Sequence, residues 1–152
     1  MVFSPSGLIP ARFLSLISHL VITILLLWSR DENVKSSLPL EYSVIEYAAR
    51  DYQMTVGLCV ALALIGLELV TFLFGVTMFM PTTSTILNSR CTVCDLDDVA
   101  VLCHSSGSVL LSHFLFDAWN CRLYWWVFAL CSVLPAAVDL ASGAALLLFR
   151  RS

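Results

Sequence analysis

Glu68 and Asp139 each lie inside a long apolar run, and these two acids are the strongest chemical signal in the chain. An ionised acid at the centre of a membrane-spanning helix costs about 2.5–3.5 kcal/mol on insertion scales. One interpretation makes them part of a proton or ion relay, with His19 and His113 as further members. The other makes them neutral hydrogen-bonding groups that join helices. The second is favoured, because no third acid, aligned row of basic residues or pair of broken helices marks a pathway.

A second pattern has a weak resemblance to a zinc site. Cys91 and Cys94 form a single C-x-x-C pair, and Cys103 is followed directly by His104. Adjacent ligands fit a closed tetrahedral site poorly, so no metal is expected here. The sequence also lacks a nucleophile–base constellation, a phosphate loop and a dinucleotide fingerprint. We therefore expect neither an enzyme nor a bound cofactor.

Helices must hold these residues, because four apolar runs account for most of the chain. The runs cover approximately residues 10–29, 54–80, 99–116 and 123–149. An α-helix needs about 20 apolar residues to cross a bilayer, and in lipid its backbone groups are paired internally. Hydrophobic residues make up 59% of the chain and charged residues only 12%, which leaves too little polar surface for a soluble domain. The sequence therefore predicts an all-α, polytopic membrane protein, with residues 1–152 forming one four-transmembrane-helix bundle.

Charge gives a weaker indication of orientation and partners. With both termini in the cytosol, the basic residues divide equally between the two sides, so the positive-inside count is tied. The pair Arg150-Arg151 adjoins an apolar end, and acids crowd the first loop, which favours cytosolic termini. The net charge of −3 is small and dispersed, so no nucleic-acid partner is expected.

Pro135 interrupts the last apolar run. Proline lacks a backbone N–H and clashes with the carbonyl four residues earlier, so we expect a kink there. The carbonyl that this frees would be a hydrogen-bond acceptor for a neighbouring acid.

The first loop contains a helix-start signal. Ser43 followed three residues later by Glu46 is a capping box, and Glu46 with Arg50 is an i,i+4 pair in the favourable order. Apolar residues recur on one face from 43 to 53, which predicts a short amphipathic helix lying on the membrane. An extension of the second span into water is the other interpretation.

Blocks of residues also occur in an order that is typical of one family. They are Gly7 to Leu14, His19 to Val21, Trp28 to Asp31, Leu38 to Leu40, Glu46-Tyr47, Glu68-Leu69, Phe72-Leu73, Gly75-Val76, Leu111-Ser112, Trp119, Tyr124-Trp125, Cys131-Ser132 and Leu134-Pro135-Ala136 with Asp139. On these blocks, which extend over nearly the whole chain, the sequence resembles the transmembrane protein 107 family.

The resemblance implies a four-span, non-enzymatic scaffold of the ciliary transition zone, at the base of the cilium. Such a scaffold helps to recruit Meckel-syndrome, Joubert-syndrome and tectonic proteins, controls the composition of the ciliary membrane, and supports ciliogenesis and Hedgehog signalling. The lipid bilayer is the other expected partner, and no small-molecule substrate is expected. The alternative, from the residues themselves, is a small proton-coupled transporter or channel subunit that uses Glu68 and Asp139.

One segment departs from the family pattern. Ser89 to Val101 looks inserted, and it carries Asp95, Asp97 and Asp98. Because three acids are too costly in a lipid-facing helix, the third span should begin after Asp98. We expect this segment to be dispensable for a scaffold function.

Overall fold

The computed structural model describes the backbone of residues 5–73 and 90–141, and the side chains of 9–73 and 98–141. The helices are α1 (Pro5–Ser36), α2 (Val44–Leu73), α4 (Arg90–Asp117) and α5 (Cys121–Phe128), followed by a π-helical turn η1 (Ala129–Val133). The chain is helical again from 134 to 141. No strand occurs in this part of the chain, so the all-α prediction is confirmed.

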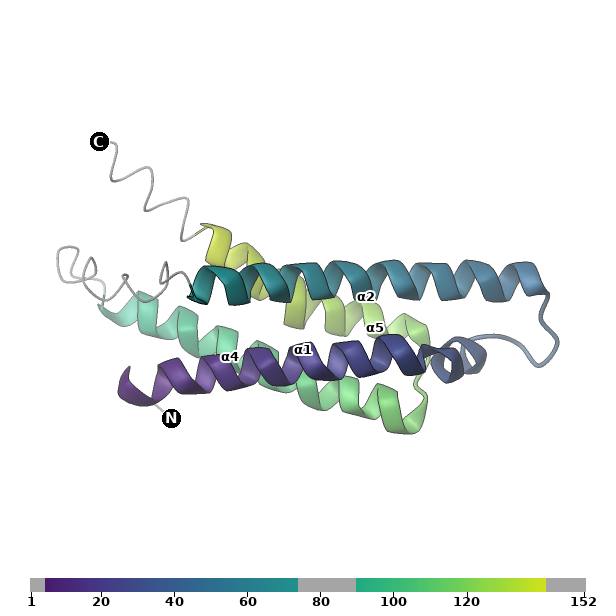
Figure 1. Ribbon diagram of the computed structural model, residues 1–152, viewed down its shortest axis with the longest axis horizontal. Helices are drawn as coiled ribbons and strands as arrows, with labels where there is room; N and C mark the ends of the chain where they lie inside the picture. The colour runs from purple at the N-terminus through teal and green to yellow at the C-terminus, as the bar shows by residue number, and fades with distance from the viewer. Residues whose placement is uncertain (1–4, 74–89, 142–152) are drawn as a thin grey trace.

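The helices run alternately up and down an elongated bundle (Figure 1). The beginning of α1, the end of α2 and the beginning of α4 lie at one end, which we call the terminal end. The 37–43 loop and the turn between α4 and α5 lie at the other, which we call the loop end. Helix α1 packs on α2 and α4, and α5 with η1 packs on the same two helices. The neighbours therefore form a ring, with α2 and α4 on opposite sides of the interior.

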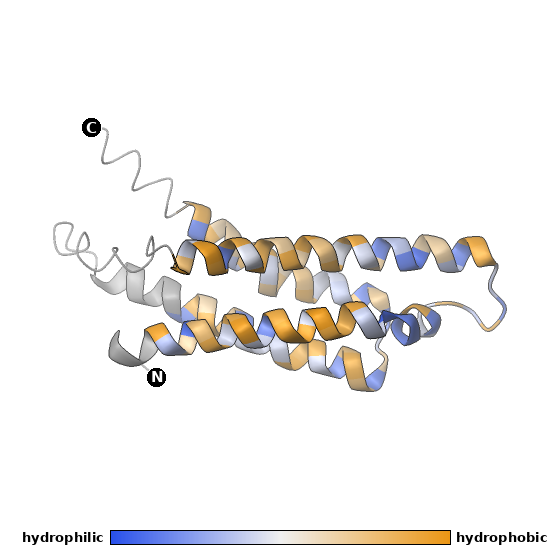
Figure 2. Ribbon diagram, viewed as in Figure 1, coloured by the Kyte–Doolittle hydropathy of each residue, from blue (hydrophilic) through white to orange (hydrophobic). Residues whose placement is uncertain are grey.

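Four helices in the described residues are long and apolar enough to cross a membrane: Ile9–Ser36, Val44–Leu73, Asp98–Asp117 and Cys121–Ala141. Figure 2 shows apolar residues along the bundle, with hydrophilic residues gathered where α1 ends and α2 begins. Large apolar side chains such as Val60, Leu102 and Leu130 are exposed on the outside. Since soluble proteins rarely expose apolar surface of this extent, these faces are suited to lipid. The predicted ends of the second and fourth runs, 74–80 and 142–149, lie outside the described residues.

A cluster of buried apolar side chains lies in the half of the bundle nearer the loop end. Leu26, Leu58 and Phe114 are fully enclosed, and Tyr124 is almost so. The Phe114 ring meets Tyr124 edge to face, with ring centroids 6.2 Å apart. Such aromatic pairs contribute about 0.5–1.5 kcal/mol beyond the area that they bury.

Helix α2 includes the segment that was predicted as a loop helix. The capping box forms, since Ser43 N–H donates to Glu46 Oε2 at 2.8 Å and Glu46 N–H donates to Ser43 Oγ at 3.2 Å. From Val44 the helix continues without a break to Leu73, which is the second of the two interpretations. The i,i+4 ion pair of Glu46 is not formed, because its carboxylate is held by Ser43 while Arg50 donates to Gln53.

Helix α4 begins at Arg90, eight residues before Asp98. The segment from 90 to 101 thus forms the first part of a helix. Where the third span begins within it stays a prediction, because the side chains of this helix are described only from Asp98. Ser89 and the side chains of Asp95 and Asp97 lie outside the described residues. Whether the segment is dispensable stays a prediction.

Asn33 closes the loop end of the bundle. Its buried side-chain amide donates to the Phe114 carbonyl at 2.8 Å and to the Trp119 carbonyl at 3.1 Å. Both carbonyls belong to the end of α4 and the following turn, where helical partners are missing. The turn also contains Ala118, whose φ of 46° lies in the left-handed region. This conformation favours glycine at helix ends.

Ala118→Gly is therefore expected to stabilise the protein by about 0.5–1 kcal/mol. The substitution removes the cost of holding alanine in the left-handed conformation, and this gain exceeds the greater backbone entropy that glycine loses on folding. Thermal unfolding in detergent micelles would measure this as a raised midpoint. Ala49→Gly, at an exposed helical position of α2, is the control and should lower the midpoint by a similar amount. Lowered midpoints for both variants would contradict the assignment of strain to Ala118.

Candidate functional site

Three ionisable side chains from three helices meet inside the bundle. His104 Nε2 of α4 lies 2.7 Å from Glu68 Oε2 of α2, and His104 Nδ1 lies 3.0 Å from His19 Nδ1 of α1. None of the three residues is more than 3% exposed. His104 thus bridges helices on opposite sides of the interior, and we call Glu68, His104 and His19 the buried triad.

Counting protons shows how the buried triad can be neutral. A hydrogen bond between the two facing Nδ1 atoms requires one ring to carry a proton there and donate it, while the other ring accepts. If His104 donates to His19, the proton between Glu68 and His104 can reside on either residue without changing the total charge. Burying a net charge is costly, which favours this three-proton arrangement. Glu68 Oε1 is buried without a hydrogen-bond partner in the described structure, which suits the carbonyl oxygen of a neutral acid.

A second polar contact joins the first helix to the last. Arg12 of α1 donates to Asp139 Oδ2, and the Arg12 side chain is only 4% exposed while that of Asp139 is 21% exposed. Arg12 lies seven residues before His19, which is about 10 Å along a helix. Glu68 and Asp139 therefore belong to separate layers, each with its own partner on another helix.

Gly107 allows the buried triad to form. A Cβ atom at this position would lie 2.8 Å from Cys131 Cβ and 3.0 Å from His19 Cε1. Only a residue without a side chain lets α4 approach both α1 and η1 this closely. The glycine therefore places His104, one turn earlier in α4, within reach of His19.

Pro135 produces a wider turn of the last helix. Residues 129–133 form the π-helical turn η1 directly before it, and the Leu134 N–H bonds back to the Ala129 carbonyl, five residues earlier. A π turn separates the proline ring from the carbonyl with which it would clash. Asp139, one turn later, accepts a hydrogen bond from Arg12 of α1.

The other predicted residues lie elsewhere. His113 lies on an exposed face of α4, where its Nδ1 atom is 2.9 Å from Asp117 Oδ2. It is not part of the buried triad. Glu46 and Arg50 are exposed in the first turns of α2, at the loop end. The side chains of Cys91 and Cys94 are outside the described residues. Within the described part of the chain, no group of three or more His, Cys, Asp and Glu side chains could hold a metal.

The sequence did not identify His104 and Arg12 as the partners of the two acids, nor Gly107 as the site of close helix packing. Arg12 was not singled out, and His104 was considered only as the neighbour of Cys103 in a weak zinc-like pattern. Their burial becomes visible only in the structure, where His104, Gly107 and Leu111 lie on one buried stripe of α4. An ionisable residue on a buried stripe requires a partner from a facing helix.

Substitutions of Glu68 test whether its charge matters to the fold. Glu68→Gln can donate from its amide to His104 Nε2 and keep every bond of the triad, so stability should be unchanged. Glu68→Leu leaves that nitrogen unpaired and should cost about 1 kcal/mol, as ordinary interhelical bonds do. Thermal unfolding in micelles measures both. If Glu68→Gln proved as damaging as Glu68→Leu, a structural role for the charge would replace the neutral account.

Taken together, the apolar outer faces, four spanning helices and buried polar contacts define a polytopic α-helical membrane protein. A family model described as "Transmembrane protein" matches residues 8–142. Transmembrane protein 107 of Danio rerio is 47% identical over 134 residues, covering 88% of this chain and 90% of the relative. Transmembrane protein 107 of Rattus norvegicus and of Homo sapiens are each 43% identical over 136 residues, covering 90% of this chain and 88% of each relative. The chain belongs to the transmembrane protein 107 family. No solved structure matches it.

Proposed function

We propose that this protein is a membrane scaffold of the ciliary transition zone, which helps to recruit Meckel-syndrome, Joubert-syndrome and tectonic proteins to the ciliary base. The observation that carries the proposal is membership of the transmembrane protein 107 family over about 90% of the chain, together with the ciliary role that the resemblance implies. In this account the protein controls ciliary membrane composition by holding partners in place, and catalyses no reaction.

The distribution of polar and apolar groups supports a scaffold. The ionisable residues inside the bundle are used to join its own helices, as in the buried triad and the Arg12–Asp139 pair. The outer faces keep large exposed apolar side chains, such as Val21, Val70 and Leu140, that lipid or the helices of partners can cover. Such a division of roles gives a stable bundle with much surface left for association.

Removal and replacement in ciliated cells tests the proposal. Cells without their own member of this family should lose tectonic and Meckel-syndrome proteins from the ciliary base, and this chain should restore them. Glu68→Gln should restore them equally, because it preserves the bonds of the buried triad. If partners stay at the base without the protein, or if the chain reaches the base but restores none of them, the scaffold proposal fails.

Proton transfer is the second candidate function, and the hydrogen-bonded order Glu68–His104–His19 is the observation that favours it. Such a chain can pass a proton along its length by exchanging donor and acceptor roles. However, the hydroxyl of Thr23, one turn beyond His19, bonds to the His19 carbonyl of its own helix and does not extend the chain. Proton flux through purified protein in liposomes, abolished by Glu68→Gln, would favour this candidate over the scaffold.

A further inference from the structure

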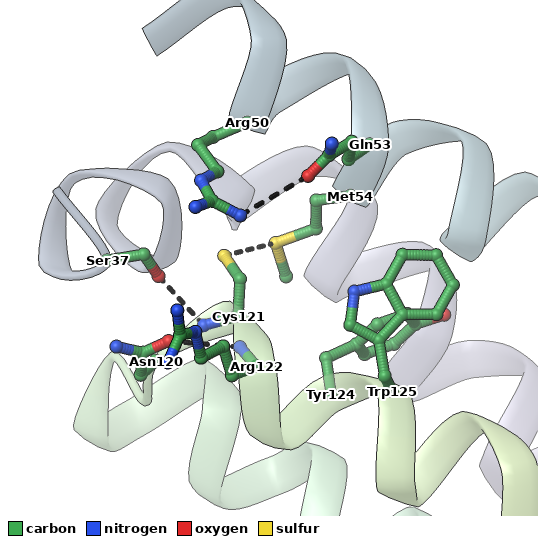
Figure 3. A pocket seen from close by; sticks show the side chains of 9 residues that line it. All are labelled: Ser37, Arg50, Gln53, Met54, Asn120, Cys121, Arg122, Tyr124 and Trp125. Atoms are coloured by element: carbon green, nitrogen blue, oxygen red, sulfur yellow. Dashed lines mark hydrogen bonds between the residues drawn. The ribbon is translucent and has the colours of Figure 1, made fainter. Parts of the chain in front are cut away.

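A cavity of about 150 Å³ lies at the loop end, between the beginning of α2 and the beginning of α5 (Figure 3). Ser37, Arg50, Asn120, Arg122 and Trp125 are among the residues that line it. Because about 10–15 Å³ suffices for one water molecule, the cavity can take a group several times larger. Its lining includes two arginines and no carboxylate.

The two arginines differ from the other basic residues of the described structure. Three of the basic side chains are held by acids: Arg12 by Asp139, Arg30 by Asp51, and Lys35 by Asp31 and Glu32. Arg50 and Arg122 form no ion pair with a described carboxylate, and Arg50 has only a 3.4 Å contact with Gln53. Both exposed, ion-pair-free guanidinium groups therefore line one cavity, from two different helices.

Two acids close to Arg50 in the sequence have hydrogen-bond partners outside the cavity. Asp51, next to Arg50 in sequence, is held by Arg30 in a two-bond contact at 2.8 and 3.3 Å. Glu46 is held by Ser43 as part of the helix cap. Asp51 and Glu46 thus have partners of their own, and the residues that line the cavity include two positively charged side chains and no negatively charged one.

The surroundings place the cavity at the level of lipid headgroups. The apolar span of the last helix starts at Cys121, beside Arg122. Trp125, which lines the cavity, is 45% exposed, and Trp126 next to it is 70% exposed. Indole rings favour the membrane–water interface. Exposed apolar side chains, such as Leu130 of η1 and Val60 of α2, lie further along the same helices, where acyl chains would pack.

We propose that this cavity binds the phosphate group of an anionic phospholipid, with Arg50 and Arg122 as its two ligands. Guanidinium groups bind phosphate through charge-assisted, often two-pronged hydrogen bonds. Trp125 provides the rim at the interface, and the acyl chains run along the adjacent apolar faces. The inference goes beyond the proposed function and does not depend on where in the cell the protein resides.

Titration of phosphatidic acid onto the purified full-length chain in micelles, followed by native mass spectrometry, tests the site. Arg50→Gln and Arg122→Gln should each weaken binding about tenfold or more, the loss expected for a hydrogen bond to a charged group. Lys35→Gln is the matched control. It removes one charge at the same end, outside the cavity, and should bind like the unaltered chain.

The remaining outcomes overturn the proposal. Equal weakening by Lys35→Gln would mean that diffuse charge, and not the cavity, attracts the lipid. Unchanged binding by both arginine variants would remove the site. Inorganic phosphate that competes at the same concentration as phosphatidic acid would make the ligand a soluble anion. The thermal unfolding midpoints of the two arginine variants serve as the folding control. They should equal that of the unaltered chain, because both side chains are exposed, and a loss of binding is then not a loss of folding.

Discussion

Gly107→Ala is expected to destabilise the bundle by about 2 kcal/mol, although alanine is the better helix former. The added Cβ would lie 2.8 Å from Cys131 Cβ and 3.0 Å from His19 Cε1, closer than carbon atoms pack, so α4 must move away from α1 and η1. Overpacking a close contact of this kind costs about 1–3 kcal/mol. The movement also lengthens the His19–His104 hydrogen bond. Thermal unfolding in micelles measures the loss.

Gly66→Ala is the control for this experiment, because a Cβ atom at Gly66 meets nothing within 4 Å. Its higher helix propensity should leave stability unchanged or raise it by up to about 1 kcal/mol. If the two alanine variants behaved alike, the close approach of helices at Gly107 would not be a determinant of this fold.

Asp139→Leu is expected to have the largest effect, a loss of about 3–5 kcal/mol. The Arg12 guanidinium is 4% exposed, and removing its carboxylate leaves a buried charge without that counter-charge. Arg12→Leu should cost less, because the Asp139 side chain is more exposed than that of Arg12 and so its charge is less deeply buried. Expression level and unfolding midpoint of the full chain in micelles report the difference.

The exchanged variant, Arg12→Asp with Asp139→Arg, isolates the pairing from the packing. If the pair acts as an ionic contact between the first and last helices, the exchange should recover part of the loss from either single leucine variant. An exchanged variant less stable than both singles would show that surrounding groups, not the pair, determine these positions.

The predicted fold and the observed one agree where composition alone decides. Four runs of apolar residues leave few alternatives to four crossing helices, and the described residues contain four helices that are long and apolar enough to cross a membrane. The sequence left open whether the helix that starts near Ser43 is separate from the second span or continuous with it, because a capping box marks where a helix starts but not how far it continues. The structure continues it to Leu73.

The candidate site was only half predictable. Glu68 and Asp139 stand out in any apolar run, but their partners depend on which helix faces which, and hydropathy carries no information on that. His104 and Arg12 become recognisable only once the structure shows that His104 of α4 reaches Glu68 of α2, and that Arg12 of α1 reaches Asp139 of the last helix. Gly107 is similar, since a glycine in a helix has no distinctive signal until a neighbouring backbone is known. Arg50 and Arg122, 72 residues apart in sequence, share a cavity for the same reason.

Imaging of the tagged full-length chain in ciliated cells tests the central claim most directly. The measurement is the concentration of the tagged protein at the base of the cilium, compared with the rest of the ciliary and plasma membranes. The account predicts a sharp maximum at the base for the unaltered chain and for Glu68→Gln. Asp139→Leu should lose this maximum and be retained inside the cell, because its bundle is destabilised. An unaltered chain that folds, reaches the cell surface and spreads evenly over it would contradict the assignment to the ciliary transition zone.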